Sequence, residues 1–142
     1  MSRKYYSLRL GEEQYRLRLT IRGQKNLAER FHEDTLQTIL TAATDSQRMA
    51  ALLEEALNWE GSGNPNTDGE AFYDLLVDQG YCGQIQFSAL AFDLAVTSGL
   101  MTAQQAGQLK ASVSQAVADV FAHLDQPQEV GEPAVPFDVQ TD

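Results

Sequence analysis

The sequence predicts an α+β fold, mostly α, with an N-terminal antiparallel β-hairpin packed on a bundle of about five to six helices. Two apolar-polar alternations between residues 5 and 22 have the period of half-buried strands. From residue 24 to residue 124, apolar residues recur every three to four positions, with capping and helix-ending residues between the runs. At 142 residues, 43% hydrophobic and 21% charged, the chain suits a single globular domain over residues 1–124.

The hairpin is expected over residues 5–22. Its second strand, residues 15–22, alternates strictly, and residues 11–14 are the expected connection. The predicted inward side chains are Tyr6, Leu8, Leu10, Tyr15, Leu17, Leu19 and Ile21, and the opposite face carries Arg9, Arg16, Arg18 and Arg22. Because a lone hairpin is marginally stable in water, its apolar face must pack on helices.

The helices are delimited by capping residues and glycines. Short helices are expected over residues 24–32 and after Asp34, and a longer amphipathic one after Asp45. Residues 60–69 form a loop by composition, and Thr67 with Glu70 has the spacing of a capping box for a helix that ends at Gly80. The helix over 84–98 is apolar nearly all round and should be central, and the last helix covers 103–124.

The C-terminal segment differs in composition from the rest. Residues 125–142 contain three of the four prolines and no basic residue. A segment of this kind is typical of a disordered acidic tail.

The net charge of −10 is unevenly distributed along the chain. Residues 1–30 hold eight basic and three acidic side chains, a net of +5, whereas residues 31–142 hold two basic and seventeen acidic ones, a net of −15. The net charge of −15 on residues 31–142 disfavours a protein that binds nucleic acid or anionic lipid with its whole surface. No apolar run is long enough for a membrane span or a leader, so a cytosolic protein that is not secreted is expected.

The residue types needed for catalysis are sparse. Cys82 is expected as a small buried residue and His32 and His123 as surface residues, with no third group to complete a nucleophilic site. The loop over 64–69 resembles a calcium loop, but Leu75 occupies the position of the bidentate glutamate, so a turn with a helix cap is the better interpretation. Neither an enzyme nor a metal or other cofactor is therefore expected.

Two surfaces remain as candidates for binding a partner. The basic face of the hairpin, Arg9, Arg16, Arg18 and Arg22, could protect an open sheet edge or pair within the domain, contact an acidic protein, or contact nucleic acid. The stripe Leu109, Val113, Val117, Val120 and Phe121 on the last helix either receives apolar segments of a partner or only packs on the central helix. Pairing of hairpin edges is a route to a homo-oligomer, either a dimer or a ring.

Three stretches resemble tail assembly chaperones of long-tailed phages and prophages of Gram-positive bacteria. They are YYSLRLGEEQYRLRLTIRGQKNL (5–27), RMAALLEEALNWEG (48–61) and DGEAFYDLLVDQGYCG (68–83), the last followed by a buried helix. The similarity covers about residues 5–122.

This resemblance implies a non-enzymatic protein of the host cytoplasm that is absent from the mature virion. It implies binding to the tape measure protein, which the chaperone keeps soluble, and help in assembling tail tube protein around it. Residues of the family cannot be transferred one by one to this chain. The alternative is a small nucleic-acid-binding regulator that uses the basic hairpin.

Overall fold

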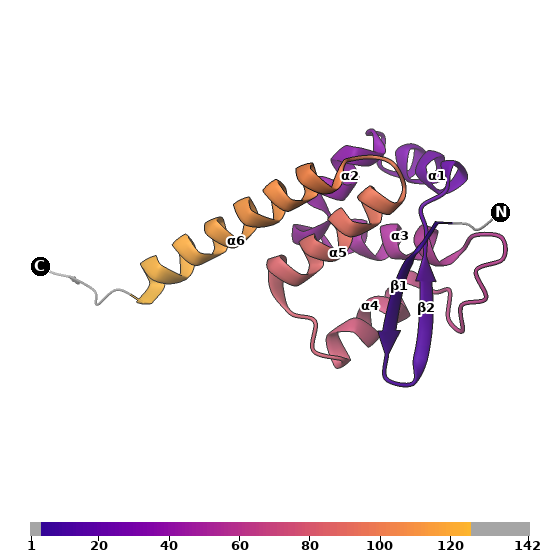
Figure 1. Cartoon of the computed structure of the whole chain (residues 1–142), viewed down its shortest axis with the longest axis horizontal. Coiled ribbons are helices and arrows are strands. Elements are labelled where there is room, and N and C mark those ends of the chain that lie inside the picture. The colour runs from indigo at the N-terminus through magenta and orange to yellow at the C-terminus, as the bar shows by residue number, and fades with distance from the viewer. Residues whose placement is uncertain (1–3, 126–142) are drawn as a thin grey trace, which may run out of the picture.

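The computed structural model describes residues 4–125 and shows a mostly helical α+β fold, as predicted (Figure 1). The elements are β1 (Tyr6–Leu10), β2 (Glu13–Leu17), α1 (Ile21–Phe31), α2 (Thr35–Thr41), the 3-10 turn η1 (Ala42–Thr44), α3 (Ser46–Leu57), α4 (Gly69–Asp78), α5 (Gly83–Thr97) and α6 (Ala103–Asp125). The predicted tail lies outside the described residues from residue 126 onward.

The hairpin has the predicted inward face but a tighter turn. Leu8 pairs with Tyr15 and Tyr6 with Leu17, so the apolar side chains of both strands share one face. The connection is only two residues, Gly11 and Glu12, because Gly11 adopts a φ of 62°. Glycine with positive φ at the first of two loop positions is the arrangement of a type II′ turn, whose twist matches that of the strands.

The second strand is shorter than predicted, and residues 18–22 are not part of it. Past Leu17 the chain bonds to the helices instead: the Arg18 N–H donates to the Ala56 carbonyl at 2.9 Å, and the Leu19 N–H donates to the Ser98 hydroxyl at 3.1 Å. The Thr20 hydroxyl then accepts from the Gly23 N–H and caps α1. Ile21 is therefore a first-turn helix residue, 76% exposed rather than inward-facing.

The core lies between the hairpin, α3, α4 and α5. Leu52 and Leu53 of α3 are inaccessible to solvent. In α5, Ala91, Leu94 and Ala95 are inaccessible as well, which agrees with the central position predicted for the helix over 84–98. Phe72 of α4 meets the ring of Tyr15 edge-on, with 4.7 Å between centroids, and so joins the hairpin to the helices.

Asp68, and not Thr67, is the cap of α4. Its carboxylate accepts from the N–H groups of Glu70 and Ala71. A β-carbon on the next residue, Gly69, would lie 2.1 Å from the Ala50 carbonyl oxygen, so the first turn of α4 rests directly on the backbone of α3. At the start of α6, Thr102 and Gln105 form a capping box: the Gln105 N–H donates to the Thr102 hydroxyl, and the Thr102 N–H donates to the Gln105 side-chain oxygen.

Candidate protein-binding site

Helix α6 divides into a packed half and an exposed half. In the first half, Ala106 is buried, and Leu109 and Val113 pack partly buried against the core. The Lys110 ammonium lies 2.6 Å from the Asp93 carboxylate and joins this half to α5. For Leu109 and Val113, packing on the central helix is thus the role that the structure shows.

The second half of α6 extends away from the body (Figure 1). Val120 and Phe121 are each 58% exposed and Leu124 is 66% exposed. Clustered apolar side chains of this size on a soluble protein are characteristic of an interaction site. Because roughly half of each side chain is still in water, covering each one with a partner would contribute about 1 kcal/mol to the binding free energy.

An apolar groove runs between this half of α6 and the start of α5. Its walls are Ala116, Val117, Val120 and Phe121 on one side and residues 82–85 on the other, and its volume is about 430 Å³. Ile85, 44% exposed, is the large apolar residue of the second wall. The groove is thus lined by Val117, Val120 and Phe121 of the predicted stripe together with Ile85. The sequence predicted for Ile85 only a position in the central helix.

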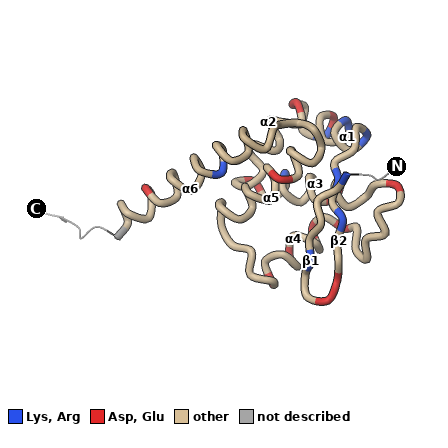
Figure 2. Tube along the Cα trace, in the orientation of Figure 1, with Lys and Arg blue, Asp and Glu red and all other residues tan. Residues whose placement is uncertain are grey.

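Few charges accompany the groove. Within the described part of α6, the charged side chains before residue 123 are Lys110 and Asp119 (Figure 2). Lys110 is paired with Asp93, and Asp119 accepts a hydrogen bond from the Gln115 amide. The exposed half of α6 is therefore suited to apolar contact and offers little for ionic recognition.

The predicted basic stripe is not continuous. Arg9 and Arg16 lie exposed on the outer face of the hairpin, whereas Arg22 belongs to α1, because the strand ends before it. The Arg16 guanidinium lies 5.6 Å from the ring centre of Tyr5, and that of Arg18 lies 5.9 Å from the ring centre of Trp59. The nucleic-acid alternative thus loses the four-arginine face on which it depended.

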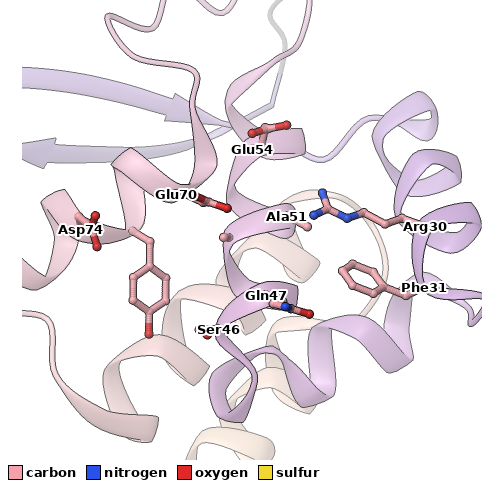
Figure 3. Close-up of a pocket in the computed structure, with 10 residues that line it drawn as sticks. Arg30, Phe31, Ser46, Gln47, Ala51, Glu54, Glu70 and Asp74 are labelled. Atoms are coloured by element: carbon pink, nitrogen blue, oxygen red, sulfur yellow. The ribbon is translucent and has the colours of Figure 1, made fainter.

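A second, polar pocket of about 720 Å³ lies between α1, α3 and α4 (Figure 3). Arg30 and Phe31 face it from α1, Glu54 from α3, and Glu70 and Asp74 from α4. Within residues 4–125, no group of three or more His, Cys, Asp or Glu side chains could hold a metal ion. The lining combines the guanidinium of Arg30 with the three carboxylates, and Ser46 and Tyr73 add hydroxyl groups.

The remaining candidate residues have structural positions. Cys82 is exposed at the start of α5, contrary to the expectation of a buried side chain, because the turn from α4 leaves it at the surface. His32 ends α1 in the left-handed conformation, with a φ of 54°. In the calcium-like loop, the Asn66 side chain accepts from the Asp68 N–H and Asp68 caps α4, so these groups serve the turn.

Asn64 is the residue that sequence reasoning missed. Its side-chain oxygen accepts from the Arg16 N–H at 2.7 Å, and its amide donates to the carbonyl oxygens of Arg16 and Leu57 at 2.8 and 2.9 Å. The Trp59 indole N–H also donates to the Arg16 carbonyl. Composition indicated only a loop here, and no local signal pairs Asn64 with a strand 48 residues earlier.

Comparison of the chain with protein-family models, with curated proteins and with solved structures finds no match. Among the helices of residues 4–125, none combines the length and apolar character that crossing a membrane would require.

Proposed function

We propose that the protein is a non-enzymatic tail assembly chaperone of a phage or prophage, which binds and solubilises a tape measure protein and assists assembly of the tail tube. The observation that carries the proposal is the apolar groove beside the exposed half of α6. The resemblance of residues 5–122 to such chaperones supplies the identity of the partner.

The chemistry of the groove fits that partner. A tape measure protein is expected to be a long helical chain with apolar stripes, which would aggregate until the tube encloses it. An apolar stripe on a partner helix would contact Val117, Val120 and Phe121 in the manner of a helix in a groove. The net charge of −15 on residues 31–142 would keep the resulting complex soluble.

Co-expression with the tape measure protein of the same phage or prophage tests the proposal. The unmodified chain should keep the tape measure protein in the soluble fraction and co-purify with it. Val120→Asp should abolish both effects, because it places a charge in the groove wall.

Ala122→Asp is the matched control. It adds the same charge two residues later, at an exposed position on the opposite face of α6, and should leave solubilisation unchanged. The proposal fails if the tape measure protein is insoluble with the unmodified chain, or if both variants solubilise it equally well.

A further inference from the structure

The two outer edges of the hairpin differ in their hydrogen bonding. At the edge of β2, the Arg16 N–H and carbonyl are both bonded to the Asn64 side chain, and the carbonyl also accepts from Trp59. The loop after α3 thus blocks this edge at Arg16, whereas the backbone groups of Gln14, which also point outward, have no bond to residues 4–125. This edge cannot accept another strand without losing those bonds.

The edge of β1 has no such cover among residues 4–125. In a hairpin with a two-residue turn, the pair next to the turn, Leu10 with Glu13, is hydrogen-bonded, and bonded pairs alternate from there. The N–H and carbonyl groups of Ser7 and Arg9 therefore point outward, as those of Arg16 do on β2. Both residues are exposed, and within the described part of the chain nothing bonds to their backbone groups.

We propose that β1 pairs antiparallel with β1 of a second copy of this chain, centred on Leu8, and so forms a four-stranded sheet across a two-fold axis. Ser7 of each copy then lies opposite Arg9 of the other, and the two pairs exchange four backbone hydrogen bonds. This pairing uses the hairpin and is independent of the groove on α6.

The sequence of β1 is complementary to itself in this register. Arg9 faces a serine rather than another arginine, so no like charges are directly opposite. On the other face, Leu8 meets Leu8 of the second copy and Tyr6 meets Leu10, which continues the half-buried apolar surface of the hairpin. A four-stranded sheet with one apolar face is also more stable than two isolated strands.

The closed edge of β2 determines the size of the assembly. A ring or fibre built through the hairpins would need two edges per chain that are open along the strand, and within the described residues only the edge of β1 is, because β2 is blocked at Arg16. Pairing through β1 uses that edge in both copies, so association stops at a dimer. The ring considered from the sequence is thereby excluded for this mode of pairing.

Ser7→Pro tests the proposal because proline removes the outward N–H and leaves the β1–β2 bonds intact. The unmodified chain should sediment as a dimer at high concentration. Ser7→Pro should raise the dimer dissociation constant about tenfold or more, since two bonds are lost per dimer. The control Ser7→Ala, which equally loses the side-chain hydrogen bond from Gln14, should remain dimeric. A chain that stays monomeric at all concentrations overturns the proposal.

Cysteine cross-linking tests the register and does not depend on the stability of the proline variant. In a Cys82→Ser background, Ser7→Cys mixed with Arg9→Cys should form a disulfide-linked dimer, because bonded antiparallel pairs have α-carbons about 5.5 Å apart. Either variant alone should link poorly, since equivalent positions lie about 7–8 Å apart on the diagonal. Equal linking in all three samples would contradict this register.

Discussion

At the scale of single residues, the absence of a side chain at Gly69 determines how closely two helices approach. A β-carbon there would overlap the Ala50 carbonyl and lie 2.7 Å from the β-carbon of Glu54. Since both obstacles belong to or adjoin the backbone of α3, neither can move away cheaply. The contact between α3 and α4 therefore depends on glycine at this position.

Gly69→Ala should lower the free energy of unfolding by about 1–3 kcal/mol, because α4 must shift away from α3. Urea unfolding followed by circular dichroism measures this. Gly107→Ala is the matched control: its β-carbon would meet no atom within 4 Å and it lies inside α6, so this variant should not be destabilised. A Gly69→Ala variant as stable as the unmodified chain would mean that the helices are not in this contact.

The guanidinium of Arg48, in α3, contacts the side chains of Phe31, Glu33 and Asp45. It bonds to both carboxylate oxygens of Glu33 at 3.0 Å and to Asp45 at 2.5 Å, and its centre lies 4.8 Å from the ring centre of Phe31. The hydrogen bonds from Arg48 lower the pKa of Glu33 and of Asp45 below their ordinary values of 4.5 and 3.8. The carboxylates therefore favour folding only while they are ionised.

The stability contributed by this cluster should be present at neutral pH and disappear as the pH falls through the lowered pKa values. Arg48→Gln should therefore destabilise the protein at pH 7, and the difference from the unmodified chain should shrink below about pH 4. Denaturant unfolding of both proteins from pH 7 to pH 3 measures the difference. If the difference in free energy of unfolding stays constant over this range, the ion pairs do not contribute to the stability.

At the scale of elements, α6 behaves as two segments. Its first half is fixed to α5 by Leu109, Val113 and the ion pair of Lys110. Its second half, from about Ala116, has mostly exposed side chains and is about 15 Å long at 1.5 Å per residue. Helical segments without tertiary contacts are marginally stable in water.

Hydrogen exchange should therefore separate the two halves of α6 in the free protein. Amides of residues 107–113 should exchange slowly, and those of residues 116–124 should exchange orders of magnitude faster. Leu109→Ala should destabilise the whole protein by about 1–3 kcal/mol, whereas Leu124→Ala should change its stability little. Uniform protection along α6 would contradict the division.

The helices and strands of the structure show which features of the fold the local sequence pattern predicts. Alternation predicted the inward face of the hairpin, and helical periodicity with caps predicted α2, α3, α5 and α6 within a few residues. The predicted second strand was too long because Ile21 continues the alternation by coincidence, while the Thr20 cap starts a helix. The groove was predicted only in part, because Ile85 reaches it through the packing of α5 against α6, which no local pattern encodes.

At the scale of the whole molecule, charge and apolar surface are separated. Lys and Arg residues gather on α1 and the hairpin, and α6 extends from the other side of the body (Figures 1 and 2). The open edge of β1 and the apolar groove are thus different surfaces. A dimer formed through β1 would use none of the residues that line the groove.

We propose that the groove on α6 receives apolar segments of a tape measure protein. Hydrogen exchange of this chain with and without that protein tests it most directly. Binding should slow exchange at residues 116–124 and 82–85, Val120→Asp should remove this protection, and Ala122→Asp should preserve it. Protection confined to other elements, or no protection when the two proteins are mixed, would show that the groove is not the binding site.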